Sequence, residues 1–192
     1  MGWAATQLSK NIDGVTVVGT TSPEKYPEVQ KNGVDKTLPL NSDFEKNLAQ
    51  MCPGGFDLIL STYAGPLYGF LETQLKPLGR IVLIGANNLI QNENKLSVLT
   101  FLKGWWTTKN VRLEDLIVYN RVAAGLHLGT LIDKDPERVR DALNKIFEMV
   151  KEQKLRVKIH EVLPMERVVE ATKLLAQRKN VGKVLISMRT EK

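Results

Sequence analysis

Residues 2–25, GWAATQLSKNIDGVTVVGTTSPEK, decide the fold of this chain. Apolar residues recur there at the spacing of an amphipathic helix, at Ala4, Ala5, Leu8 and Ile12. Asp13-Gly14 ends that helix, and the β-branched run 15–18 predicts a buried strand that continues to Thr20. A helix that leads directly into a buried parallel strand is the second half of a βαβ unit. We therefore expect the first strand of this unit to lie before Gly2, and the chain to be a fragment of a longer protein.

The composition is that of an ordinary globular protein, with 192 residues, 43% of them hydrophobic and 25% charged. The net charge is +6, but basic and acidic residues alternate, so we expect no nucleic-acid partner. The single cysteine, Cys52, excludes an internal disulfide framework. Cys52, His127 and His160 are too few and too scattered for a recognisable zinc site. We expect no metal ligands.

Strand and helix patterns alternate along most of the chain, which predicts an α/β fold with a doubly wound parallel sheet. The expected strands cover residues 15–20, 34–40, 56–61, 80–85 and 122–128. The expected helices cover residues 2–12, 23–32, 42–49, 66–75, 96–103, 113–121 and 136–153. In the strand order 3-2-1-4-5-6, loss of the first strand separates strand 15–20 from strand 56–61. Either those two strands pair directly, or the chain is a fragment, which we favour.

After residue 154 the pattern changes. Residues 157–162 alternate with the period of a strand that has one wet face, a helix is expected over 166–177, and 184–186 is an apolar run. We expect a domain boundary here, with 1–154 as a truncated dinucleotide-binding domain and 155–192 as a separate segment. Its two strands are expected to have no parallel neighbours in this chain.

A polar cluster follows the strand 15–20, where an NAD enzyme carries an acidic residue for the ribose. This chain has Thr20, Thr21 and Ser22 instead, with Lys25 one helical turn later. Hydroxyls and a cation suit a 2′-phosphate, which favours NADP over NAD. The alternative is a helix cap, with Ser22 as the N-cap residue and Pro23 in the first turn. Both interpretations can hold together, because an N-terminal turn also binds anions.

Several motifs agree with one known family. They occur in the order Gly85-Ala86-Asn87-Asn88-Leu89, Trp105-Trp106, Asn120-Arg121, Gly125-Leu126-His127-Leu128-Gly129 and Asn180-Val181-Gly182-Lys183-Val184. This pattern resembles the zinc-independent quinone oxidoreductases of the medium-chain dehydrogenase/reductase superfamily, and most closely the group of synaptic vesicle membrane protein VAT-1. The resemblance runs from Gly2 to Lys192. Leu40 and Ser61 depart from it, because many relatives carry tyrosine and aspartate at these positions.

The resemblance implies a Rossmann domain that binds NADPH, preceded by a GroES-like domain against which residues 155–192 pack. It makes Gly2 the last glycine of the pyrophosphate loop. It assigns the 2′-phosphate to Ser22 and Lys25. The nicotinamide loops would be formed by Gly85, Ala86, Asn87, Leu126, His127 and Leu128. The segment that closes over the cofactor would contain Asn180, Gly182 and Lys183. On residue type alone, His127 is also compatible with a satisfied core histidine.

The implied function is the C-terminal part of an NADPH-dependent reductase of a quinone or enone, with no dedicated catalytic acid or base. This chain alone is expected to be inactive. A non-catalytic, VAT-1-like binding protein is the alternative; a methyltransferase is weaker, since its second strand normally ends in an acid. The resemblance further implies a homodimer through the edge of strand 122–128. Its location would be cytoplasmic, or peripheral on vesicles or the mitochondrial outer membrane.

Overall fold

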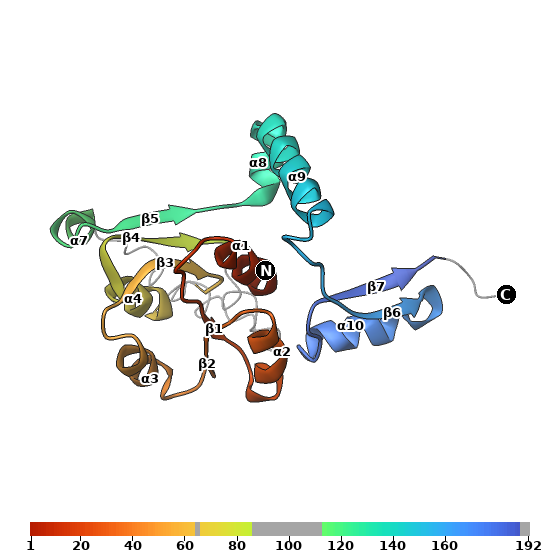
Figure 1. Cartoon of the computed structure of the whole chain (residues 1–192), viewed down its shortest axis with the longest axis horizontal. Coiled ribbons are helices and arrows are strands. Elements are labelled where there is room, and N and C mark those ends of the chain that lie inside the picture. Colours follow the sequence, from red (N-terminus) through yellow and green to blue (C-terminus); the bar gives the residue numbers. More distant parts are fainter. Residues whose placement is uncertain (64–65, 86–112, 189–192) are drawn as a thin grey trace, which may run out of the picture. The chain divides into compact units, whose positions relative to one another are not determined.

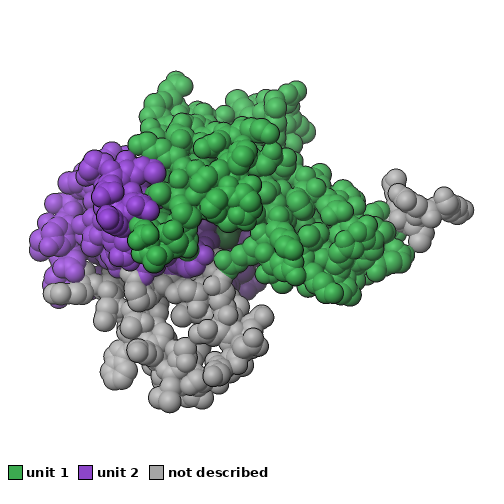
Figure 2. Space-filling model, turned by 90° about the horizontal axis from the view of Figure 1, so that it is seen from below, with its two compact units in different colours: residues 1–44, 140–192 green, residues 45–139 purple. Residues whose placement is uncertain are grey.

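A computed structural model describes residues 1–63, 66–85 and 113–188 (Figure 1). Ala86 and Asn87, the helix expected over 96–103 and Trp105-Trp106 lie outside the described residues. The chain divides into two compact units, one of residues 1–44 with 140–192 and one of residues 45–139 (Figure 2). Each unit is described by itself, and the boundary expected at residue 154 stays a prediction.

The first unit begins with the expected helix and strand, α1 (Gly2–Lys10) and β1 (Val18–Thr20). β1 pairs in parallel with β2 (Lys36–Leu38). β1 starts three residues later than expected. The reason is local, because the N–H of Val17 donates to the side-chain carboxylate of Asp35 at 2.7 Å rather than to a strand backbone.

The helix expected over 23–32 is split into a 3-10 turn, η1 (Pro23–Lys25), and a short helix, α2 (Tyr26–Lys31). Pro27 explains the split, since a proline has no N–H to donate to the carbonyl four residues earlier. The N–H of Tyr26 instead donates to the carbonyl of Pro23, which closes a tighter turn.

The second unit begins within α3 (Phe44–Met51). It carries a parallel sheet of β3 (Phe56–Ser61), β4 (Leu75–Leu83) and β5 (Val122–Gly125), in the order β3-β4-β5. Among the described residues, α4 (Pro66–Thr73) lies between β3 and β4 along the chain, and α7 (Leu113–Val118) lies between β4 and β5. The core of this unit packs around Ile81, which is fully buried, with Tyr68 and Leu75 against it. β4 starts five residues earlier than expected because Phe56 already pairs with Leu75.

The strand expected over 122–128 is wrong in its last three residues. β5 ends at Gly125, and a helix, α8 (Leu128–Lys134), begins after two connecting residues. His127 causes this change, because its Nδ1 accepts the N–H of Thr130 at 3.1 Å and so caps the helix. Leu126 and His127 therefore form the connection between β5 and α8.

The C-terminal part continues with α9 (Pro136–Lys151), β6 (Ile159–Pro164), η2 (Met165–Arg167), α10 (Val168–Ala176) and β7 (Lys183–Ser187). The expectation that its two strands lack parallel neighbours is wrong, since β6 and β7 pair with each other in parallel. α10 is the crossover, and its Ala171 is buried, as is Leu163 of β6. A short βαβ unit forms because these apolar faces can cover one another.

The strand pairing confirms the α/β fold class and its parallel sheets. Among the described residues β1 pairs with β2, and β3 pairs with β4. β3 is less buried than its apolar sequence predicts, with Leu58 49% and Leu60 45% exposed. One face of this strand is thus left open.

Candidate cofactor site

The carboxyl ends of β3, β4 and β5 meet at one edge of the sheet. Beyond the strands, the N–H of Ile84 donates to the carbonyl of Ser61 at 2.9 Å, and that of Leu126 to the carbonyl of Leu83 at 2.8 Å. The residues that follow each strand therefore stay in register. This is the edge at which open α/β sheets bind ligands.

Gly85 lies at this edge beside the end of β3. A Cβ added to Gly85 would lie 3.7 Å from Cβ of Thr62, an ordinary contact distance. Sequence analysis did not single out Thr62, although its position directly after β3 was the available signal. Ser61 is buried, and its hydroxyl donates to the carbonyl of Tyr63 and accepts from its N–H. Ser61 thus holds the turn after β3.

His127 and Leu128 lie after β5 at the same edge. His127 is exposed, so it is not a core histidine. Its Nδ1 lies 2.9 Å from Oγ1 of Thr130 and also accepts the N–H of Thr130. The other ring nitrogen, Nε2, takes part in neither of these two contacts. Leu128 is 58% exposed and Leu126 49% exposed. The edge thus combines one polar ring with two exposed leucines.

In the first unit, Lys25 and Asn180 come together from positions 155 residues apart. The ammonium of Lys25 donates to the carbonyl of Asn180 at 3.0 Å and to the carbonyl of Arg178. Ser22 occupies the expected N-cap position of η1, but its side chain makes no capping bond. A hydrogen bond with the Ser22 side chain lowers the pKa of Glu24.

Gly182 is required by the local geometry. Its φ is +95°, and an added Cβ would overlap the carbonyl group of Lys158, with the carbonyl carbon at 2.8 Å. Asn180 donates from Nδ2 to the carbonyl of Gly182 at 2.7 Å. The N–H of Lys183 donates to the carbonyl of Lys158 at 2.8 Å as β7 begins. The segment 180–183 is thus a fixed turn against residue 158.

The sequence-predicted site residues fall into two groups. Gly85, Leu126, His127 and Leu128 lie at the sheet edge of the second unit, and Ser22, Lys25, Asn180, Gly182 and Lys183 lie in the first unit. Gly2 opens α1, and no described atom lies within 4 Å of a Cβ built on it. Its place in a pyrophosphate loop stays a prediction.

Curated relatives match the whole chain. The human synaptic vesicle membrane protein VAT-1 homolog is 31% identical over 193 residues, 100% of this chain and 49% of the relative. The synaptic vesicle membrane protein VAT-1 of Tetronarce californica is 32% identical over 195 residues, 99% of this chain and 49% of the relative. The chain therefore spans about half the length of the curated relatives that it matches.

Solved structures show the same fold. The human VAT-1 homolog-like protein superposes with a TM-score of 0.72 at 22% identity, covering 100% of this chain and 51% of that one. CurK enoyl reductase gives 0.70 at 21%, covering 98% and 51%. CurA from Vibrio vulnificus, solved in complex with NADPH, gives 0.72 at 21%, covering 99% and 54%.

The sequence model of one family matches most of the chain, over residues 33–186. That match includes all three strands of the β3-β4-β5 sheet and all of the β6-α10-β7 unit except the last residue of β7. The chain belongs to the zinc-binding dehydrogenase family.

Proposed function

We propose that this chain is the nucleotide-binding part of an NADPH-dependent reductase that acts on a quinone or an enone. The observation that carries the proposal is the meeting of three parallel strand ends at one sheet edge, with Gly85, Leu126 and His127 directly after them. Parallel sheets of this kind bind dinucleotides at that edge. Similarity to CurA, solved with NADPH, and to CurK enoyl reductase supports the cofactor and the reaction class.

Bound NADPH would supply a hydride from its nicotinamide ring. The chain's own residues would bind the cofactor and exclude water. Gly85 has no side chain, so its backbone can approach a flat ring closely. Leu126 and Leu128 are exposed apolar side chains at the same edge and would lose water when a ring covers them. The proposal assigns no catalytic acid or base to this chain.

Zinc has no part in this proposal despite the family's name. The described parts of the chain hold no group of three or more His, Cys, Asp or Glu residues placed to bind a metal ion. The residues available do not fit a zinc centre, which needs at least three protein ligands. We therefore derive no step through a metal.

Lys25 is the proposed contact of the 2′-phosphate, and its present partners bear on this role. Its ammonium is bonded to the carbonyls of Arg178 and Asn180, which are dipoles without net charge. A phosphate dianion is a stronger acceptor for an ammonium group than a carbonyl is. Binding of the 2′-phosphate would therefore replace these two carbonyls and release the segment 178–180.

Binding titrations with NADPH and NADH test the cofactor assignment. In the natural full-length product, Lys25→Ala should weaken NADPH binding by roughly 1–3 kcal/mol and leave NADH binding nearly unchanged. Lys46→Ala, an exposed lysine on α3, is the matched control and should affect neither cofactor. Equal losses for both cofactors in Lys25→Ala would contradict a 2′-phosphate role.

The isolated residues 1–192 should bind NADPH weakly in the same titration, because the expected first strand and its glycine loop would contact the pyrophosphate. A form extended by such a strand and glycine loop should bind tightly. Tight binding by residues 1–192 alone would show that the pyrophosphate is held elsewhere.

A non-catalytic role is the second candidate, and one observation favours it. Lys25 is already occupied by carbonyl groups of the chain itself, an arrangement that suits a protein that does not bind NADPH. Such a protein would attach peripherally to vesicles or mitochondria and would act through partners there. None of the described helices is long and apolar enough to cross a membrane. Failure of every full-length form to bind NADPH would select this candidate.

The proposed homodimer pairs β5 with its copy across a two-fold axis. The N–H of Leu126 points to β4, so that of Gly125, one residue away, points to the open edge. Gly125→Pro removes this outward donor and should convert a dimer to a monomer in sedimentation experiments. Gly125→Ala keeps the donor, and its Cβ would meet nothing within 4 Å, so it should stay dimeric. A wild-type monomer at micromolar concentration would refute the interface.

A further inference from the structure

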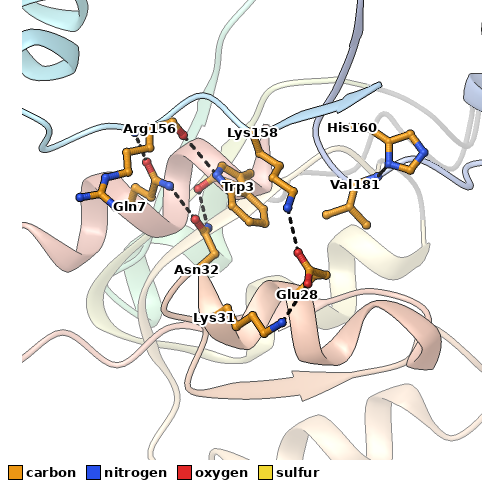
Figure 3. A network of polar contacts seen from close by, with 9 residues as sticks. All are labelled: Trp3, Gln7, Glu28, Lys31, Asn32, Arg156, Lys158, His160 and Val181. Atoms are coloured by element: carbon orange, nitrogen blue, oxygen red, sulfur yellow. Dashed lines mark hydrogen bonds and ion pairs between the residues drawn. The ribbon is translucent and has the colours of Figure 1, made fainter. Parts of the chain in front are cut away.

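A pocket of about 320 Å³ lies in the first unit, and none of its lining residues is one of the proposed cofactor residues (Figure 3). α1 contributes Trp3 and Gln7 to its lining, and α2 with the residue after it contributes Glu28, Lys31 and Asn32. The segment 156–158, before β6, completes the lining. The volume is at the lower end of the range for small-molecule sites, roughly 300–1,000 Å³.

A ring of hydrogen bonds fixes the pocket's frame. Arg156 is held through its main chain, because its N–H donates to Oε1 of Gln7 at 2.7 Å and its carbonyl accepts from the indole of Trp3 at 3.3 Å. The amide of Gln7 donates to Oδ1 of Asn32 at 2.6 Å. Asn32 in turn donates to the carbonyl of Trp3 at 2.9 Å. The polar groups of the frame are therefore set before any ligand arrives, which reduces the entropy lost on binding.

The lining is positively charged. It holds Lys31, Arg156 and Lys158 against one carboxylate, Glu28, a net charge of +2. Glu28 bridges both lysines, at 2.9 Å to Lys158 and 3.1 Å to Lys31. The guanidinium of Arg156 has no hydrogen-bond or ion-pair partner in the described parts of the chain. One cation of the lining thus remains available to a ligand.

An aromatic ring of the lining adjoins one of these cations. The ammonium of Lys158 lies 5.8 Å from the centroid of the Trp3 ring, within the range of a cation–π contact. A flat ligand group can stack on an indole, and a guanidinium binds carboxylate or phosphate with two parallel hydrogen bonds. We propose that this pocket binds a small organic anion in which a flat ring carries a carboxylate or phosphate, with Arg156 as the anion contact and Trp3 as the ring contact.

Titrations of the full chain with phenyl phosphate and with benzoate test the proposal. The indole N–H resonance of Trp3, assigned with a Trp3→Phe variant, reports on the pocket in NMR spectra. At least one of the two anions should shift this resonance in a saturable way, and the stronger one identifies the preferred charged group. Benzyl alcohol lacks the charge, and inorganic phosphate lacks the ring, so both should bind more weakly. If neither aromatic anion shifts the resonance at millimolar concentration, the proposal fails.

Arg156→Gln is the decisive variant, because the frame uses only main-chain atoms of residue 156 and should stay folded. It should weaken binding of the aromatic anion by roughly 10- to 100-fold, the scale of a charged hydrogen bond. Arg80→Gln removes an exposed arginine of β4 that is not one of the lining residues, and this variant should bind as the wild type does. Equal affinity of Arg156→Gln and the wild type would overturn the proposal and leave the network as a structural link only.

Discussion

The core of the second unit and the polar network of the first unit hold their strands and helices in opposite ways. In that core Ile81 has no exposed surface, and Tyr68 and Leu75 pack on it. The polar network of Figure 3 joins α1 and α2 to the segment 156–158 through amides and ion pairs. Its Glu28–Lys158 pair is more than one third exposed on both sides. The core gains free energy by burial, whereas the network chiefly fixes geometry.

The largest effect is expected from a cavity in the core. Ile81→Ala should reduce the free energy of unfolding of the β3-β4-β5 sheet by about 2–5 kcal/mol, because the lost side chain is fully buried. Amide hydrogen exchange in β3 and β4 measures this locally. Ile81→Val is the control and should cost only about 0.5–1.5 kcal/mol. Equal protection in the alanine variant and the wild type would show that this sheet does not depend on its core.

A smaller effect is expected where the first unit depends on backbone fit. Gly182→Ala combines a φ of +95° with overlap on the carbonyl of Lys158, so the strand β7 must shift away from residue 158. We expect a loss of about 1–3 kcal/mol in protection of the β6-β7 amides. Gly54→Ala, whose Cβ would meet nothing within 4 Å, should leave the stability nearly unchanged. A full wild-type protection pattern in Gly182→Ala would contradict this close approach.

The smallest expected effect is an opposite pH dependence of stability in the two units. Burial raises the pKa of Glu72 in the core, so the stability of the second unit should fall as pH rises past the unfolded value of this carboxyl. The hydrogen bond with Lys158 lowers the pKa of Glu28, so its contribution should vanish as pH falls through the folded value. Hydrogen exchange of each unit between about pH 3 and 7 should show these opposite slopes. Glu72→Gln and Glu28→Gln should each flatten the slope of their own unit.

The sequence predicted those elements whose signals are local. The apolar spacing of α1, the strand pattern over 56–61 and the helix pattern over 136–153 predicted α1, β3 and α9 at nearly the right residues. The family resemblance assigned Gly85 and Leu126 to loops at strand ends, and in the structure these residues follow β4 and β5. Sequence analysis missed the end of β5, because a side-chain cap by His127 competes with an apolar run that also suits a strand.

By itself, the sequence determined the α/β class, the parallel strands and the family, since periodicity and short motifs depend on neighbouring residues. Only the tertiary structure decided that β6 pairs with β7, that Lys25 meets Asn180 and that Trp3 meets Arg156. The last contact joins residues 153 positions apart. Such contacts form when distant segments pack, and because they use main-chain carbonyls, which every residue has, no sequence pattern marks them.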